Sequence, residues 1–327
     1  MTRFFRLTVA VVLTAVVFYW SHPSQILAVT AAADWRWLAG ALALVLVDRS
    51  LMALRWIDLL VALAPGSRPP LTTVLRVFFT SSFVSNFVPS VASDLYRAYA
   101  LSRYDVHLAE STASVLMDRA LGVLSVVLVA AAALPFARDL DSRRELIAIV
   151  VVLFLVCLMA AAAVFSEPAA VLIRRSAALI PLKVLHRVTD ALTDAVRRYA
   201  SHCLELTRVL TLSVFVQVIR VLQGWCLGSA LGLDVPLLTY FVFIPIIVLA
   251  MQLPVTVNGI GITQWVFHEL FVRQLGSPAP QVFAFSVLFL ALGVVGTLPG
   301  GLLYIFGEKS GRRTGVSGHG LHGPHGS

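Results

Sequence analysis

Long apolar stretches recur along this chain and constrain its fold more than any other feature. Crossing the ~30 Å hydrocarbon core of a bilayer takes about 20 helical residues, and several stretches approach or exceed that length. Hydrophobic residues make up 59% of the 327 residues and charged residues only 13%, whereas soluble domains contain about 45–50% and about 25%. The sequence therefore predicts an all-α integral membrane protein that crosses the bilayer several times.

Six stretches have the length and composition of full membrane spans. They are 4–20, 35–63, 106–134, 145–166, 207–232 and 279–306. The first could instead be a secretory signal peptide, but the small residues that would form its cleavage site lie far from its apolar run. Two further segments, 71–92 and 237–275, are apolar but interrupted by Pro, Gly, Asn and Ser.

The distribution of Lys and Arg predicts the orientation of the spans, because cytoplasmic loops carry an excess of both. The segments that we place in the cytoplasm on this basis are 1–6, 64–105, 167–206 and 307–313. The segment 21–34 has no Lys or Arg and is expected outside. Both termini are then cytoplasmic, in a membrane of the cytoplasmic type. The net charge of +8 fits such loops beside anionic lipids and does not indicate a nucleic-acid partner.

This orientation determines how the two interrupted segments must run. Both ends of 71–92 lie inside, so the segment is expected to enter the membrane and return as a re-entrant helical hairpin. Both ends of 237–275 lie outside, so it is expected to do the same from the opposite face, although it is long enough for two full crossings. Re-entrant backbone persists at membrane depth only where protein or a wet cavity surrounds it.

The two interrupted segments also suggest an inverted internal repeat. The same offset of 165 positions relates Pro89 to Pro254 and Arg55 to Arg220, although chance similarity between apolar segments is an alternative. Inverted repeats whose broken segments meet near the midplane are typical of transporters. The expected divisions are 1–34 (N-terminal span and external loop), 35–134 (first repeat), 135–206 (linking span and cytoplasmic interfacial helices), 207–306 (second repeat) and 307–327 (disordered tail).

Several charged residues fall inside the predicted spans, where an ionised group costs about 2.5–3.5 kcal/mol and needs a partner or a wet cavity. We interpret them as one cationic cavity between the repeats. The residues expected to bind the substrate are Arg97, Arg119, Arg220, Asn258, Gly259 and Gly261. Those expected to tune charge or carry protons are Asp94, Asp118 and Asp48.

The alternative for these charged residues is that Asp–Arg pairs between helices only fix the packing. We favour this alternative for Asp48 and Arg49, whereas Arg97 and Arg119 favour a substrate site. Adjacent side chains on a helix diverge by about 100°, so Asp118 and Arg119 must find separate partners. For Arg55, snorkelling to the inner interface is as good an explanation as a place in the cavity.

A set of short motifs, in order, resembles one known family. They are Ala53-Leu54-Arg55-Trp56, Asn86-Phe87-Val88-Pro89-Ser90 running to Asp94-Leu95-Tyr96-Arg97, Ser114 to Gly122, Leu253 to Gly261, and Gly300-Gly301-Leu302-Leu303-Tyr304. Over roughly 35–306 the chain resembles the lysylphosphatidylglycerol-synthase transmembrane-region family. That family includes the flippase portion of the bacterial multiple peptide resistance factor and hopanoid-biosynthesis-associated membrane proteins.

The resemblance implies lipid translocation or lipid-precursor handling. It does not imply synthesis, because the family's soluble aminoacyl-transfer domain is not expected in about 20 residues after the last span. Two positions depart from the family: Ala92-Ser93 replaces a Gly-Gly pair, and Thr263-Gln264 lacks the usual acidic residue. The first departure affects how closely a phosphate could approach the turn before Asp94. The second removes a carboxylate that could pair with an arginine or relay a proton.

The sequence therefore predicts a non-enzymatic lipid flippase or transporter for a polar or anionic lipid: a phospholipid, aminoacyl-phospholipid, polyprenyl phosphate or hopanoid-type lipid. It contains no motif for catalysis, a cofactor or a metal site. The main alternative is a non-transporting scaffold that docks a lipid-modifying enzyme through 167–206, and transport of a soluble ion stays open. The expected partners are the lipid and either a second copy in a homodimer or such an enzyme.

Overall fold

A computed structural model gives the fold of the chain. It describes residues 33–63, 70–88, 90–104, 106–136, 202–252 and 261–306, with isolated positions between 144 and 199. The predicted span 4–20 and the tail 307–327 lie outside the described residues. The predicted span 145–166 and the cytoplasmic segment 167–206 lie outside them for the most part.

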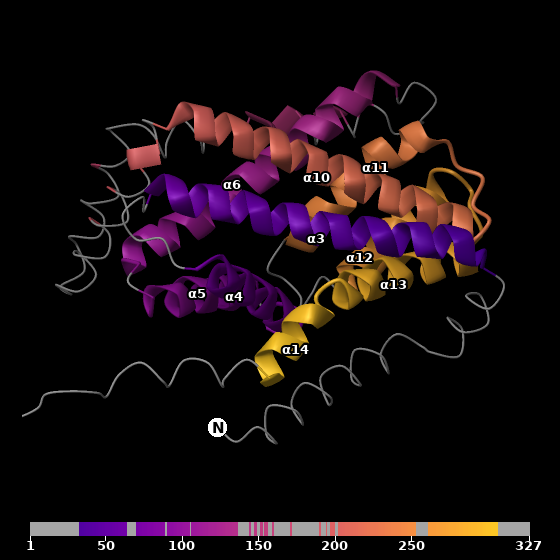
Figure 1. Cartoon of the computed structure of the whole chain (residues 1–327). Helices are drawn as coiled ribbons and strands as arrows, with labels where there is room; N and C mark the ends of the chain where they lie inside the picture. The colour runs from indigo at the N-terminus through magenta and orange to yellow at the C-terminus, as the bar shows by residue number, and fades with distance from the viewer. Residues whose placement is uncertain are drawn as a thin grey trace, which may run out of the picture.

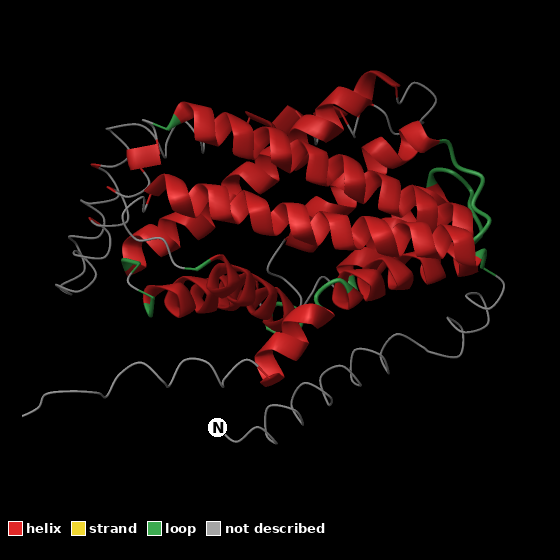
Figure 2. Cartoon of the chain, viewed as in Figure 1, coloured by secondary structure: helices red, strands yellow, loops and turns green. Residues whose placement is uncertain are grey.

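Helices form every regular element of the described residues (Figure 2). In the first part of the chain they are α3 (Trp35–Leu63), α4 (Leu71–Val84), α5 (Ser90–Ser102), α6 (Leu108–Ala133) and the 3-10 turn η1 (Leu134–Phe136). In the second part they are α10 (Cys203–Ala230), α11 (Leu237–Gln252), α12 (Ile262–Phe267), the π-helical turn η4 (His268–Arg273), α13 (Ala279–Val295) and α14 (Leu298–Phe306). The predicted all-α class is confirmed.

Among the described residues four helical stretches are long and apolar enough to cross a membrane. They are Trp35–Ala62, Leu108–Ala133, Cys203–Ala230 and Ala279–Leu303. Four of the six predicted spans are therefore found, with boundaries shifted by up to four residues. The two interrupted segments form shorter helices, with 14 residues in α4 and 16 in α11, about 21 and 24 Å at ~1.5 Å per residue.

Helices α3 and α10 lie side by side and antiparallel through the centre of the molecule (Figure 1). At one end of the pair, the Asp34 backbone N–H donates to the Ala230 carbonyl at 3.1 Å. At the other end, Arg208 forms an ion pair with Asp58 at 3.3 Å. Between these ends the helices pack at ordinary van der Waals distance, since a Cβ built on Gly40 would lie 3.9 Å from the Cys226 sulfur.

The largest packed cluster of apolar side chains belongs mainly to the second part of the chain. It joins α10, α11, α12, η4 and α13. Its centre is a group of aromatic rings in which Phe267 meets Phe285 edge-to-face at 4.7 Å and stacks on Phe271 at 5.7 Å. Such pairs contribute about 0.5–1.5 kcal/mol beyond their burial, so this part of the fold is held by shape complementarity.

Helices α4 and α5 form a hairpin beside α6, and α14 packs along α4. The approach of α14 depends on glycine, because a Cβ on Gly300 would overlap the backbone of Phe79. The Gly-Gly pair noted in the sequence therefore acts as a helix contact here.

The predicted span 279–306 is not one continuous helix. The helix breaks at Gly296 and Thr297, between α13 and α14. At this break a Cβ on Gly296 would overlap Val45 of α3, and the Thr297 hydroxyl accepts a hydrogen bond from Asn86 at 2.7 Å. The contact with the end of α4 explains why the chain turns where hydropathy alone predicts continuity.

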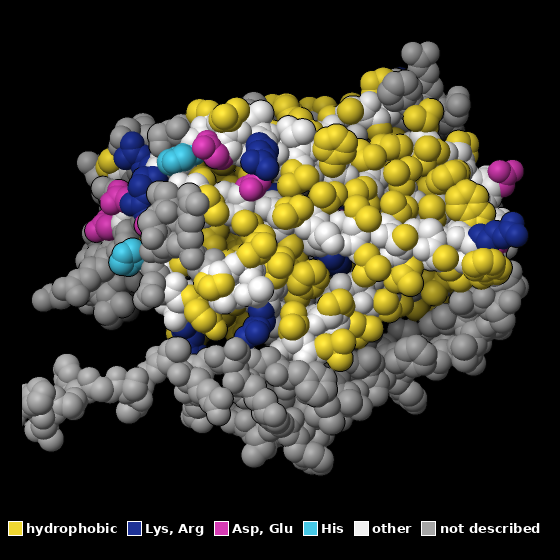
Figure 3. All heavy atoms as spheres, in the orientation of Figure 1, with side chains coloured by type: hydrophobic (Ala, Val, Ile, Leu, Met, Phe, Trp, Pro, Cys, Tyr) yellow, Lys and Arg dark blue, Asp and Glu magenta, His cyan; other side chains and the backbone are white. Residues whose placement is uncertain are grey.

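The outer surface of the helices is mainly apolar. Figure 3 shows hydrophobic side chains over most of one face, with most of the charged side chains toward its left end and a few at its right end. The exposed large hydrophobic residues include Leu46, Leu54, Phe215 and Trp265. Apolar surface of this extent with charges at the ends is expected where helices contact lipid, so the fold agrees with a multi-pass membrane protein.

Candidate functional site

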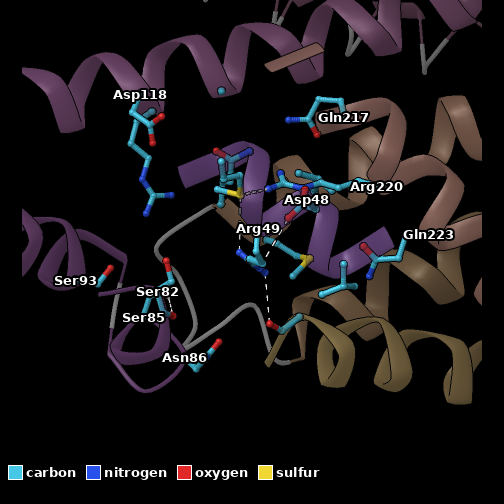
Figure 4. A pocket seen from close by; sticks show the side chains of 18 of the residues that line it. Asp48, Arg49, Ser82, Ser85, Asn86, Ser93, Asp118, Gln217, Arg220 and Gln223 are labelled. Carbon is cyan, nitrogen blue, oxygen red and sulfur yellow. Dashed lines mark hydrogen bonds and ion pairs between the residues drawn. The ribbon is translucent and has the colours of Figure 1, made fainter. Parts of the chain in front are cut away.

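A polar cavity of about 250 Å³ lies between the central helices. Its lining comes from α3, α4, α5, α6, α10, α11 and α13, so both parts of the chain contribute to it. The polar residues that line it are Asp48, Arg49, Arg55, Ser82, Ser85, Asn86, Ser93, Asp118, Arg97, Arg119, Gln217, Arg220, Gln223 and Gln252 (Figure 4 labels most of them). In the described part of the chain, five arginines and two aspartates face this one space.

Asp118 of α6 forms ion pairs with arginines on two other helices. Its Oδ1 receives Nε of Arg55 at 2.8 Å, and its Oδ2 lies 3.7 Å from Nη1 of Arg97. All three side chains are at most 9% exposed, so the carboxylate and its partners are removed from solvent. Removing one partner of such a buried pair is costly because the other charge is left uncompensated.

Arg55 and Arg97 have further contacts that hold their guanidinium groups in place. Arg55 donates to the Ser213 hydroxyl of α10 at 3.1 Å, which links α3, α6 and α10 through one side chain. Arg97 donates through Nε to Ser81 at 3.0 Å. Its guanidinium carbon also lies 5.2 Å from the Trp56 ring centre and 4.9 Å from that of Phe78, which are cation–π distances.

Asp94 and Arg119 form the most regular ion pair of the site. Arg119 grips both carboxylate oxygens, with Nε to Oδ2 at 2.8 Å and Nη2 to Oδ1 at 3.1 Å. Two parallel N–H···O bonds of this kind fix geometry as well as charge. The pair ties α5 to α6, and Arg119 is also part of the cavity wall.

A third carboxylate, Asp48 of α3, lies between two arginines in the same way as Asp118. Arg220 of α10 donates through Nε to its Oδ1 at 2.9 Å. Nε of Arg49 lies 3.8 Å from its Oδ2, which is too long for a hydrogen bond. In Figure 4 Arg49 points into the middle of the cavity, between Ser82 and Ser85 on one side and Arg220 on the other.

The structure brings together most, but not all, of the residues predicted for the site. Arg97, Arg119 and Arg220 all line the cavity, as do Asp118 and Asp48. Asp94 is not part of the lining but forms an ion pair with Arg119. The predicted separate partners for Asp118 and Arg119 are also found, since Asp118 pairs with Arg55 and Arg97 and Arg119 pairs with Asp94.

Of the predicted second wall, only Gly261 falls within the described residues. Asn258 and Gly259 lie outside the described residues. Gly261 is at the start of α12, with a φ of +88° and no lining contact with the cavity. Its positive φ explains the glycine on conformational grounds alone. Helices α11 and α13 contribute Val248, Met251, Phe289 and Gly293 to the described wall of the cavity.

Sequence reasoning missed two arginines of the site. Arg55 is only 4% exposed and pairs with Asp118, so the interpretation that it snorkels to the interface is wrong. Arg49 points into the cavity, where the sequence favoured a packing role. The polar positions Ser82, Ser85 and Asn86 carry a readable signal, since they lie within five residues at the end of a mainly apolar helix.

Comparison with known proteins identifies the family. The family model described as lysylphosphatidylglycerol synthase TM region matches residues 5–300. The chain belongs to this family. The match begins earlier than the motifs noted in the sequence and covers every helix that lines the cavity. It is a match to the transmembrane region alone, and a search of curated proteins finds no match to the chain.

Proposed function

We propose that the protein is a lipid flippase or transporter of the bacterial inner membrane, with both termini in the cytoplasm. The observation that carries the proposal is the cavity itself, which holds five arginines among helices long enough to cross the bilayer. Buried ionisable groups at membrane depth mark substrate or ion pathways in membrane proteins. The family, whose transmembrane region is associated with flipping of aminoacyl-phospholipids, supports a lipid rather than a soluble ion.

The proposed architecture is an inverted repeat with two re-entrant hairpins, α4–α5 and α11–α12, the second including η4, which continues α12. Its strongest support is a reciprocal contact between α3 and α10. The offset of 165 positions relates Arg55 to Arg220 and also Asp48 to Ser213. Arg55 donates from α3 to Ser213 on α10 at 3.1 Å, and Arg220 donates from α10 to Asp48 on α3 at 2.9 Å. A two-fold axis between the repeats would exchange these two contacts.

In the proposed mechanism the polar head group enters the cavity while its acyl chains remain in the bilayer. Arg97, Arg119 and Arg220 stabilise the head group electrostatically, because charges interact more strongly in a low-dielectric site than in water. Asp48, Asp94 and Asp118 keep these arginines in position when the lipid is absent. The protein catalyses no covalent step in this account and needs no metal or cofactor.

The proposal is tested in proteoliposomes that contain tail-labelled phospholipids, by bleaching the label in the outer leaflet with a membrane-impermeant reductant. The wild type is expected to move lipid between leaflets, and Arg119→Ala to move it at least about tenfold more slowly, since a tenfold change corresponds to about 1.4 kcal/mol. The matched control is Arg208→Ala. Arg208 also pairs with an aspartate, at 3.3 Å, but it lies outside the cavity.

Equal rates for wild type, Arg119→Ala and protein-free vesicles, with an imposed proton gradient and folded protein, would contradict transport. The scaffold alternative would then become the better account. Its own test is replacement of 167–196, the part of the cytoplasmic segment before Tyr199 and α10, by a neutral linker. The replacement should leave lipid movement intact if the protein is a transporter and abolish function if the segment docks an enzyme.

A further inference from the structure

Three carboxylates serve five arginines around the cavity in the described part of the chain. Asp94 is committed to Arg119 alone, whereas Asp118 and Asp48 are each shared between two arginines. In both shared cases one arginine is close, at 2.8 or 2.9 Å, and the other is distant, at 3.7 or 3.8 Å. The described groups therefore carry a formal surplus of two positive charges, and the distant arginines, Arg97 and Arg49, hold it.

The two distant arginines differ in how their charge is compensated. Arg97 lies over the Trp56 and Phe78 rings and donates to Ser81, so three neutral partners stabilise it. Arg49 has only a long contact from Nη2 to the Gly293 carbonyl, at 3.4 Å, and one from Nη1 to the Met52 sulfur, at 3.9 Å. Its buried Nε has no hydrogen-bond partner. Of the described cavity arginines, Arg49 is therefore the one whose charge is least satisfied.

The same edge of the guanidinium group has different contacts in Arg49 and Arg119. In Arg119 the Nε–Nη2 edge binds both oxygens of Asp94. In Arg49 that edge has only Asp48 at 3.8 Å and the Gly293 carbonyl at 3.4 Å. This is the edge that matches two oxygens of a carboxylate or a phosphate.

The surroundings of Arg49 are built to hold it in the cavity. Gly293 of α13 and Gly296, which directly follows α13, face its side chain, and a Cβ on Gly296 would crowd both Arg49 and Val45. Arg49 lies 14 positions into α3, about 21 Å along the helix at ~1.5 Å per residue, so its backbone is deep in the predicted span. A surplus charge at this depth is unfavourable unless a ligand of opposite charge offsets it.

We propose that the transported lipid carries a net negative phosphate head group, a phosphodiester or phosphomonoester without a compensating amine, and that Arg49 is its principal phosphate ligand. The Nε–Nη2 edge of Arg49 binds two phosphate oxygens. Arg220 remains paired with Asp48, and its positive charge attracts the phosphate at longer range. This inference rests on the proposed transport function and names the substrate class for the same cavity.

A head group with a net positive charge does not fit this cavity. Its ammonium groups would need carboxylates, and the three carboxylates of the described site are already bound by arginine. The cationic head group would also add to the surplus of positive charge. The chain therefore differs in expected substrate from a lysylphosphatidylglycerol flippase, although it belongs to the family that takes its name from that lipid.

The test compares the wild type with Arg49→Gln, Arg49→Lys and the control Arg208→Gln on four tail-labelled lipids with the same acyl chains. These are phosphatidic acid, phosphatidylglycerol, phosphatidylcholine and lysylphosphatidylglycerol. The wild type should move the first two about tenfold faster than the last. Arg49→Gln should lower their rates about tenfold, Arg49→Lys should retain an intermediate rate because it keeps the charge but loses the fork, and Arg208→Gln should match the wild type.

A binding measurement separates this inference from the transport proposal. In detergent, short-chain dihexanoyl phosphatidic acid should raise the melting temperature of the wild type and of Arg208→Gln, but not that of Arg49→Gln. If no lipid moves, transport fails, yet this difference in stabilisation would still support the anion site. Lysylphosphatidylglycerol moving as fast as phosphatidylglycerol, or Arg49→Gln matching the wild type in both assays, would overturn the inference.

Discussion

The hairpins α4–α5 and α11–α12 are the proposed counterparts of each other, but different forces hold them. The first is tied to α6 by ion pairs, Asp94 with Arg119 and Arg97 with Asp118. The second is held by aromatic rings, among which Phe267, Phe271 and Phe285 pack at 4.7 to 5.7 Å. Directional, charged contacts hold the first hairpin, and close-packed apolar contacts hold the second. We therefore expect changes of charge to affect the first hairpin most, and changes of side-chain packing to affect the second.

The largest loss of stability is expected from Asp118→Asn. The substitution leaves Arg55 and Arg97 facing each other without a carboxylate in a buried site, which costs about 3–5 kcal/mol for a broken buried pair. The measurement is thermal unfolding in detergent, followed by tryptophan fluorescence. The double variant Asp118→Asn/Arg55→Gln should recover part of the loss, because one surplus charge is removed with the carboxylate.

An unchanged melting temperature in Asp118→Asn would contradict the electrostatic account of the first hairpin. A double variant less stable than Asp118→Asn alone would show that Arg55 is needed for its packing and for Ser213, not for its charge.

A smaller loss, about 3 kcal/mol, is expected when Phe267 is truncated to Ala in the second hairpin. Phe267 is fully buried and contacts three other rings, so truncation leaves a cavity. Its matched control is Phe215→Ala on the lipid-facing surface, where the side chain is 59% exposed and the effect should be small. Equal effects of the two substitutions would break the distinction between a packed and an ion-paired hairpin.

A loss of about 1 kcal/mol is expected from Tyr199→Phe. The Tyr199 hydroxyl donates to the Leu59 carbonyl at 2.8 Å, and burial raises the pKa of this phenol well above its ordinary value, so it remains a donor. Urea unfolding midpoints of the two proteins would measure the difference. No difference would mean that this contact does not anchor the segment before α10 to the end of α3.

The smallest effect is expected from Glu269→Gln, the exposed ion pair of the second hairpin. Glu269 and Arg273 are four residues apart, and the arginine side chain is 67% exposed. Exposed pairs contribute about 0.2–1 kcal/mol at most, so both stability and lipid movement should be close to those of the wild type. A large loss of transport in this variant would mean that the second hairpin depends on charge as well as on packing.

The sequence predicts the helical class and four of the spans because hydropathy depends on local composition. The separate partners of Asp118 and Arg119 also follow from helix geometry alone. The break at Gly296 does not follow, because it depends on Asn86 and Val45, which lie more than 200 positions away in the chain.

The site was predicted in outline, and its errors have the same physical origin. Three of the five arginines were identified from their depth in apolar segments. For Arg55 the sequence leaves two explanations open, because its partner Asp118 is 63 positions away. The importance of Arg49 depends on which arginine of each pair comes closer to the shared carboxylate, a matter of fractions of an ångström that no sequence pattern records.

The most direct test of the central claim is to fill the cavity and measure lipid movement. Ser85 lines the cavity, and Cys203 is exposed at the start of α10, away from it. Two proteins are compared after labelling with the same bulky thiol reagent, one with Ser85→Cys as its only cysteine and one with only Cys203. The account predicts that labelling at position 85 stops lipid movement in proteoliposomes and that labelling at Cys203 leaves it unchanged. Full labelling at position 85, verified by mass spectrometry, with lipid still moving at the unlabelled rate would contradict passage of the head group through this cavity.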